Sequence, residues 1–183
     1  MSLNVIAFTG SLRTGSYNKL VLKAAMELKP AEMEIESFDI APIPVYNEDV
    51  REKGFPPAVE VFREKIRKAD ALLIVTPEYN YSMPGVLKNA IDWASRPPDQ
   101  PFNDKPAAIM GASGSILGTA RAQYHLRQTC VFLNMHLVNK PEVMIARAQD
   151  KFDASGRLMD ETTRKLIADL LMNLATWTRR LKG

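Results

Sequence analysis

The sequence contains little of the chemistry that disulfides and metal sites require. Its 183 residues include one cysteine, Cys130, and two histidines, His125 and His136. A lone cysteine cannot form a disulfide within the chain, and these three residues have no metal-ligand spacing. We therefore expect no disulfide framework and no metal, and the cysteine usage favours a reducing cytoplasm.

Long hydrophobic runs and an excess of one charge are also absent. No apolar stretch approaches the roughly 20 residues of a membrane span, and the first apolar segment starts too close to Met1 for a signal peptide. Lysine and arginine total 24 against 21 acidic residues, a net charge of +3, and the two signs are interspersed. We therefore expect neither nucleic-acid nor membrane binding, and a small anionic ligand is sufficient reason for the surplus.

Apolar and amphipathic segments alternate along the chain, and 46% apolar residues suffice for one substantial core. Strands are expected at 5–8, 33–38, 71–75 and 106–111, with a fifth strand region at 137–145 that Pro141 interrupts. Helices are expected at 18–28, 58–68, 84–94, 119–133 and 161–181. Residues 39–57 hold too many prolines for a regular element and are expected to form a long loop.

This alternation predicts one α/β domain over residues 1–183, a doubly wound, five-stranded parallel sheet with helices on both faces. Ligands of such sheets bind beyond the carboxyl ends of the strands, at the point where the strand order reverses. Three segments are expected to meet there: 9–18, 76–85 and 111–118.

The segment from Val5 to Asn18, VIAFTGSLRTGSYN, has the form of a strand, a phosphate-binding loop and a helix start. It is no P-loop, because Ser16 and Tyr17 stand where Lys and Ser or Thr are required. It is no dinucleotide loop, because Leu12 replaces the second glycine. A single terminal phosphate fits the donors better, with an ordinary turn capped by Ser16 as the alternative. These donors are Ser11, Arg13, Thr14, Ser16 and Asn18.

The other two loops are suited to a flat molecule. In the second, two aromatic residues, an amide and a carboxylate stand between Pro77 and Pro84, which are expected to hold the loop extended. The third, from Gly111 to Gly118, has mostly short side chains that let a ring lie against the main chain. A flexible turn is the alternative for this third loop.

Together these motifs resemble the NADPH-dependent FMN reductase family. They read Gly10-Ser-Leu-Arg-x-x-Ser16-x-Asn18, Pro77-Glu-Tyr-Asn-Tyr-Ser82, Pro84-Gly-x-Leu-Lys-Asn-Ala-Ile-Asp-Trp93 and Gly111-x-Ser-Gly114. The resemblance implies a flavodoxin-like fold and FMN as cofactor. The members with the most similar loops are bacterial NAD(P)H:quinone reductases that also reduce chromate, azo dyes or free flavin.

The resemblance also implies which residues bind the cofactor. The FMN phosphate would be held by Ser11, Arg13, Ser16 and Asn18. The isoalloxazine would be bordered by Pro77, Glu78, Tyr79, Asn80 and Tyr81, with Ser113 meeting it from the third loop. No catalytic side chain is required, because FMN itself accepts the hydride. Glu78 is expected to orient a loop or partner rather than act as a base.

The expected reaction is ping-pong: NADPH or NADH reduces FMN and leaves, and a quinone or a similar acceptor such as a nitro compound enters the same pocket. Two alternatives remain. The enzyme could release reduced FMN as its product, or the chain could be a flavodoxin-type electron carrier. Such carriers are generally strongly acidic, so the net charge of +3 argues against the second.

The family is usually dimeric or tetrameric, so we expect a homodimer or homotetramer, with the helices at 84–93 and 119–133 as candidate contacts. Matching positions in the quinone reductases imply hydrogen bonds between subunits for Arg121, Tyr124 and Glu142, with a solvated helix face as the alternative. Cys130 is expected in the core, and Trp93 in the core or at a subunit interface.

Overall fold

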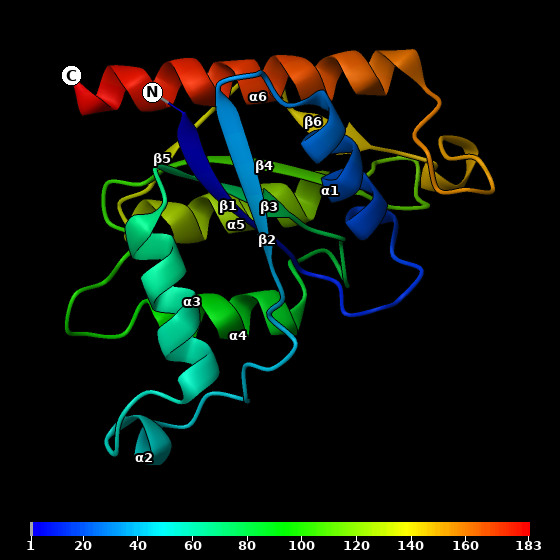
Figure 1. Cartoon of the computed structure of the whole chain (residues 1–183). Helices are drawn as coiled ribbons and strands as arrows, with labels where there is room; N and C mark the ends of the chain where they lie inside the picture. Colours follow the sequence, from blue (N-terminus) through cyan, green and yellow to red (C-terminus); the bar gives the residue numbers. More distant parts are fainter. Residues whose placement is uncertain (1) are drawn as a thin grey trace.

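The computed structural model describes residues 2–183 and shows a parallel sheet with helices on both faces (Figure 1). The strands are β1 (Leu3–Thr9), β2 (Met33–Phe38), β3 (Ala71–Val75), β4 (Pro106–Ala112), β5 (His136–Leu137) and β6 (Val143–Ile145). The helices are α1 (Tyr17–Leu28), α2 (Glu48–Arg51), α3 (Pro57–Lys68), α4 (Gly85–Ala94), α5 (Ala120–Phe132) and α6 (Glu161–Lys182), with a 3-10 turn at Ala148–Asp150.

The strand order is β2-β1-β3-β4-β5, and β6 also pairs with β4. Every pair is parallel. The chain moves outward from β1 to β2 and then crosses to β3 on the other side of β1, so the order reverses between β1 and β3. This is the doubly wound, flavodoxin-like arrangement expected from the sequence.

The fifth strand position is divided between two short strands. β5 pairs with Pro106 and Ala107 at the start of β4, and β6 pairs with the last three residues of β4. The residues between them include Pro141, which cannot donate to a ladder because it lacks an N–H group. The predicted interruption is confirmed.

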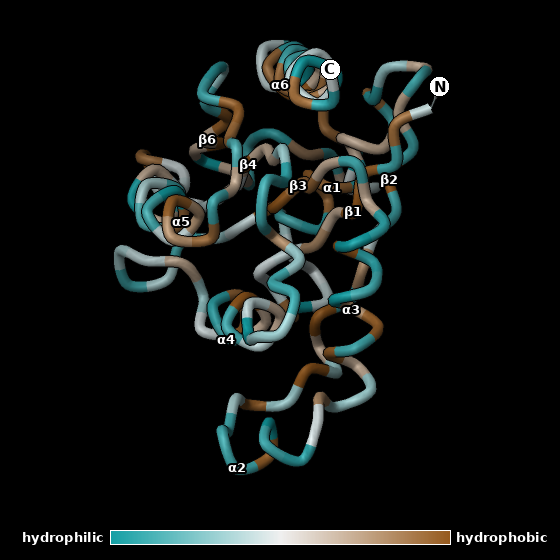
Figure 2. The backbone as a smooth tube through the Cα atoms, turned by 90° about the vertical axis from the view of Figure 1, so that its left-hand side faces the viewer, coloured by the Kyte–Doolittle hydropathy of each residue, from teal (hydrophilic) through white to brown (hydrophobic). Residues whose placement is uncertain are grey.

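Alternate residues of the central strands point into two separate cores. Val5 and Ala7 of β1 join a core with α1 and α6, whereas Ile6 and Phe8 join one with α3, α4 and α5. Figure 2 shows α6 and α4 on opposite sides of the sheet. A strand buried on both faces lacks polar alternation, which explains the unbroken apolar run of β3.

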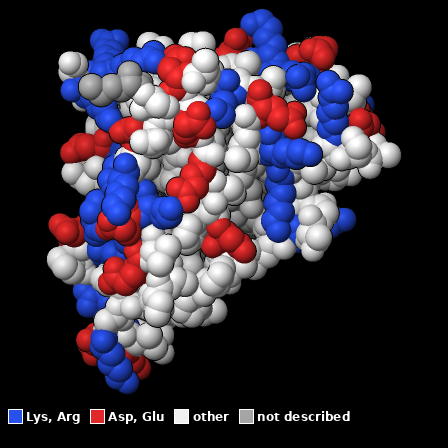
Figure 3. Space-filling model, viewed as in Figure 1, with Lys and Arg blue, Asp and Glu red and all other residues white. Residues whose placement is uncertain are grey.

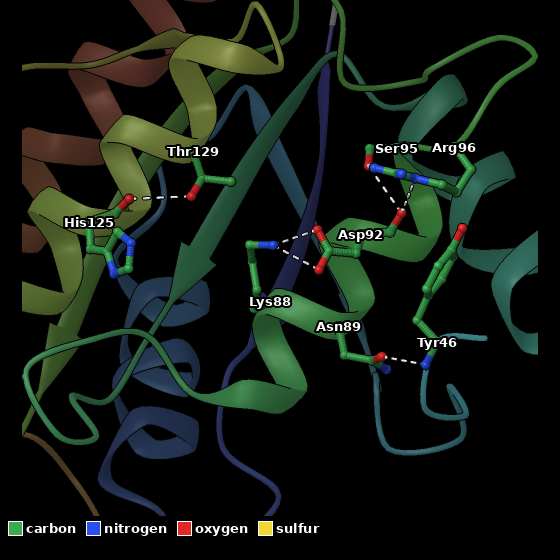
Figure 4. Close-up of polar contacts among 8 residues, drawn as sticks. All are labelled: Tyr46, Lys88, Asn89, Asp92, Ser95, Arg96, His125 and Thr129. Carbon is green, nitrogen blue, oxygen red and sulfur yellow. Dashed lines mark hydrogen bonds and ion pairs between the residues drawn. The ribbon is translucent and has the colours of Figure 1, made fainter. Parts of the chain in front are cut away.

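The expected long loop at 39–57 is present but is not wholly irregular, because it contains α2 at its far end (Figure 1). The loop is fastened to α4. The side chain of Asn89 accepts from the N–H of Tyr46 at 2.8 Å and donates to the carbonyl of Pro44 at 2.8 Å (Figure 4). Trp93, fully buried, donates its indole N–H to the same Pro44 carbonyl at 2.8 Å. Trp93 is therefore a core residue, and its helix holds the loop in place.

The predicted helix and strand positions are otherwise correct within two residues at each end. Pro84 does not lie inside α4 but precedes it as the N-cap residue. In the part of the chain that the structure describes, no helix is both long and apolar enough to span a membrane.

Gly111 allows β3 and β4 to approach at the edge where the loops begin. A methyl group at this position would stand 2.0 Å from the carbonyl oxygen of Thr76 and 2.5 Å from Oγ1 of Thr119. We expect Gly111→Ala to lower the free energy of unfolding by about 3 kcal/mol, because the strands must separate to admit it. Denaturant unfolding of the flavin-free protein measures this loss.

Gly85→Ala is the matched control, since a methyl group there meets nothing within 4 Å. We expect its free energy of unfolding to stay within about 0.5 kcal/mol of the parent value. Equal stability of the two variants would contradict the close approach at Gly111.

Candidate functional site

Three loops follow β1, β3 and β4 and begin side by side at the carboxyl edge of the sheet. The N–H of Gly10 donates to the carbonyl of Val75 at 2.9 Å, and the N–H of Thr76 donates to the carbonyl of Met110 at 3.0 Å. The start of each of these two loops is thus hydrogen-bonded to the end of the neighbouring strand in the sheet. The structure brings together the three segments that the sequence placed at one site.

The first loop offers a row of donors to an anion. Among residues 2–183, no group accepts a hydrogen bond from the main-chain N–H groups of residues 11–15. Ser11 and Ser16 are buried, with 5% and 4% of their surface exposed, while Arg13 is exposed. Ser16 is the N-cap of α1, and its hydroxyl accepts from the N–H of Asn18 at 3.2 Å. The capping role offered as the alternative is therefore real, and it leaves the Ser16 hydroxyl hydrogen available to a ligand.

Asn18 ties the first loop to the third. Its buried carboxamide donates to the carbonyl of Ala112 at 2.9 Å and accepts from the N–H of Ala112 at 2.9 Å. Because both ends of the amide are engaged at the end of β4, Asn18 has only its second Nδ2 hydrogen left for a phosphate. Sequence reasoning gave it a ligand role and did not foresee this positioning role.

The second loop turns sharply at its tip. Tyr79 and Ser82 exchange two main-chain hydrogen bonds of 2.9 Å, and the residues between them, Asn80 and Tyr81, have positive φ angles of 49° and 69°. This is the geometry of a type I′ turn, which is uncommon for tyrosine. The expectation of an extended loop is therefore wrong: the flanking prolines bracket a tight turn that exposes Asn80 and both tyrosines.

Glu78 fixes this turn to the start of α5, the helix that follows the third loop. One of its carboxylate oxygens accepts from the main-chain N–H groups of Arg121 at 3.0 Å and Ala122 at 3.1 Å, in the first turn of α5. The other oxygen pairs with the guanidinium of Arg121. The N-cap residue of α5, Thr119, makes no side-chain cap, so Glu78 supplies the missing acceptor and a negative charge at the positive helix end.

Two further contacts hold the turn from α5. The guanidinium of Arg121 lies 3.6 Å from the ring centroid of Tyr81. The hydroxyl of Ser82 and Nδ1 of His125 are 2.7 Å apart. Nothing in the sequence points to this role of His125, because a contact between residues so far apart in the chain leaves no local signal.

The third loop is ordered by its own hydrogen bonds. The N–H of Ser113 donates to the carbonyl of Ile145 at 3.0 Å, and the Ser113 hydroxyl donates to the carbonyl of Gly118 at 2.5 Å. Gly118 has a φ of 59° and packs against the main chain of Met144. The loop is thus folded rather than a free turn, and the hydroxyl hydrogen of Ser113 is already used within it.

The side chains expected at a subunit contact have partners within the chain. Arg121 binds Glu78, so a purely solvated helix face is the wrong description of this residue. A hydrogen bond to Glu142 raises the pKa of the exposed Tyr124 hydroxyl above its usual range. Hydrogen bonds from these residues to a second subunit stay a prediction.

Cysteine and metal chemistry have no support at this site. Cys130 is 1% exposed, and burial raises the pKa of its thiol to about 12, which confirms it as a core residue. Among the described residues, no group of three or more His, Cys, Asp or Glu side chains could hold a metal ion.

Comparison with known proteins agrees with this geometry. The family model for NADPH-dependent FMN reductase matches residues 3–150. An NAD(P)H-dependent FMN reductase of Pseudomonas aeruginosa (strain PAO1) is 65% identical over 99% of this chain and 98% of its own length. A quinone reductase of Escherichia coli (strain K12) is 47% identical over 98% of this chain and 97% of its own.

A solved structure is also similar over its full length. FerB of Paracoccus denitrificans, a flavoenzyme NAD(P)H:(acceptor) oxidoreductase, has a TM-score of 0.89 and 34% identity, covering 97% of this chain and 98% of its own. The chain is thus an FMN-using oxidoreductase that takes its electrons from NAD(P)H, and it belongs to the NADPH-dependent FMN reductase family.

Proposed function

We propose that residues 1–183 form one FMN-binding domain that transfers two electrons from NADPH or NADH to a quinone, in a ping-pong reaction. The observation that carries this proposal is the joining of three ligand-ready loops at one sheet edge by the side chains of Asn18 and Glu78. The quinone reductase names of several relatives support the choice of acceptor. The buried, inert Cys130 fits a reducing cytoplasm.

The residues of the first loop fit the phosphate end of FMN. The unpartnered N–H groups of residues 11–15, the buried hydroxyls of Ser11 and Ser16, and the exposed Arg13 supply donors and one positive charge. They stand before the N-terminus of α1, where the helix dipole also favours an anion. Asn18 would add its free Nδ2 hydrogen.

The residues of the second and third loops fit the ring system. When bound, FMN supplies the hydride and electron chemistry. The main-chain N–H groups of Asn80 and Tyr81 have no acceptor among residues 2–183 and could stabilise negative charge at the pyrimidine end of the reduced ring. Pro77, Glu78 and Tyr79 would shape the border of the ring, with Ser113 opposite.

Glu78 holds the second loop in place and is not the catalytic base. Its side chain is 6% exposed, and its carboxylate already accepts from two main-chain N–H groups and from Arg121. A base that must take a proton from a substrate needs a free lone pair within reach of that proton. The proposed reaction therefore does not use Glu78 for proton transfer.

A second subunit is proposed to cover the open side of this site. Large apolar side chains are exposed on the second and third loops and on α5. They are Tyr79, Tyr81, Ile116, Leu117, Val131 and Phe132. A homodimer or homotetramer would bury them and would complete a cleft for the nicotinamide and the acceptor.

The alternative product is reduced FMN itself, which the name of the Pseudomonas aeruginosa relative favours. The two functions differ in whether FMN leaves during turnover. Flavin retained through gel filtration, with quinone reduced without added FMN, supports the quinone reductase.

The ping-pong scheme is tested by stopped-flow mixing of the FMN-loaded protein with NADPH and no acceptor. We expect the oxidised-flavin absorbance to bleach in a single fast phase and to return when benzoquinone is added, because each half-reaction is complete in itself. Bleaching only when quinone is already present would contradict the scheme.

Glu78→Gln tests the positioning role. We expect about tenfold weaker FMN binding, since the carboxylate oxygen that faces Arg121 is replaced by an amide nitrogen and the ionic contact is lost. At saturating FMN, the rate of flavin reduction by NADPH should stay within about threefold, whereas loss of a general base costs about 100-fold or more. Glu48→Gln, which removes an exposed carboxylate from α2, is the control and should change neither value.

Val131→Glu tests the proposed subunit contact on α5, where Val131 is 79% exposed. We expect size-exclusion chromatography with light scattering to show a dimer or tetramer for the parent and smaller species for the variant, because a charge cannot be buried unpaired at an interface. Met172→Glu, on α6 across the sheet, is 49% exposed in the parent and should leave the mass unchanged. A monomeric parent protein would remove the proposal.

A further inference from the structure

Lys19 occupies an unusual position for a cation. It is the third residue of α1, three residues after the N-cap Ser16. In a capping box this position carries Glu or Gln, whose side chain reaches back over the N-cap. The first turn of α1 contains no acidic residue. The helix dipole disfavours a positive charge here, so Lys19 is a cost to the flavin-free helix.

The ammonium group of Lys19 is turned back toward the phosphate loop. Its one hydrogen bond is a long contact of 3.4 Å from Nζ to the carbonyl of Leu12. No carboxylate within residues 2–183 forms an ion pair with it. It also lines a hollow of about 330 Å³ that α1 forms with the ends of β1 and β2, where Thr9, Lys23 and Asp39 are further lining residues. Figure 3 shows positive side chains over α1 on this face of the molecule.

The positive charge available in the first loop is smaller than the negative charge of a phosphate, and Lys19 can supply the difference. A phosphate monoester carries a charge of about −1.5 to −2 near pH 7. The loop supplies one full positive charge, Arg13, and Asn18 has most of its amide engaged with Ala112. One more cation would match the dianion. Lys19 is the next residue along the helix, and its side chain already lies over Leu12 in the loop.

We propose that Lys19 is a second cationic ligand of the FMN phosphate, and that it destabilises α1 when FMN is absent. This inference rests on the proposed function, since it assumes that the loop at residues 11–16 holds the phosphate. The lysine weakens the flavin-free helix and strengthens the complex. Its removal should therefore change the two properties in opposite directions.

The test compares Lys19→Gln with the parent and with Lys23→Gln. Gln keeps the helix propensity of Lys while removing the charge. Lys23 lies one turn further along α1 and lines the same hollow, so it controls for net charge. Flavin is removed from each full-length protein, FMN affinity is measured by quenching of flavin fluorescence, and stability of the flavin-free protein by denaturant unfolding.

We expect Lys19→Gln to bind FMN about tenfold more weakly at low salt, with the difference shrinking as salt screens the phosphate. Its flavin-free form should be as stable as the parent or more stable, and Lys23→Gln should change FMN affinity less than about twofold. Unchanged affinity in Lys19→Gln, a fall of affinity and stability together, or an equal effect of Lys23→Gln would overturn the proposal. A parent protein that does not bind FMN would instead overturn the proposed function.

Discussion

The carboxamide of Asn18 forms two hydrogen bonds with the main chain of Ala112, and the geometry of the site depends on this pair. It joins the start of α1 to the end of β4 across 94 positions of sequence. A buried amide that lost one of these partners would leave polar groups unsatisfied, which costs about 1–3 kcal/mol each. The first and third loops are therefore held at a fixed separation before any ligand arrives.

Polar side chains also hold the second loop in position. Glu78 uses its carboxylate on the first turn of α5, and His125 meets Ser82 at the far end of the turn. Polar side chains thus hold the loops together, while the main-chain N–H groups at residues 11–15, 80 and 81 have no acceptor within residues 2–183. Such fixed dipoles need no reorganisation when charge develops on a bound cofactor. This arrangement suits an enzyme whose electrons move through its cofactor rather than through an acid and a base.

The sequence was informative wherever the pattern is local. Apolar runs buried on both faces predict β3 and β4, helical spacing predicts five of the helices, and Pro141 predicts the break in the last strand position. Contacts between distant segments leave no such signal. The Tyr79–Ser82 turn was expected to be extended, because prolines restrict their own conformation and that of the preceding residue. They do not reveal the positive φ angles of the residues between them.

The site residues divide along the same line. The donor-rich loop from Ser11 to Asn18 can be recognised in the sequence. The contacts of Asn18 with Ala112 and of Glu78 with Arg121 form only because the fold places β1, β3 and β4 side by side. α2 was missed because its four residues are too few for a periodic signal. The resemblance to a family assigned cofactor-binding residues to the three loops, yet it could not say which of those side chains also hold the loops.

The proposed function requires FMN to bind the main-chain N–H groups of the first two loops that have no acceptor in the described part of the chain. Hydrogen–deuterium exchange of the full-length protein with and without FMN measures this directly, segment by segment. We expect FMN to slow exchange at residues 11–15 and 80–81, while α6, on the other face of the sheet, exchanges as before. Slowed exchange spread evenly over the chain, or none at residues 11–15, would contradict it.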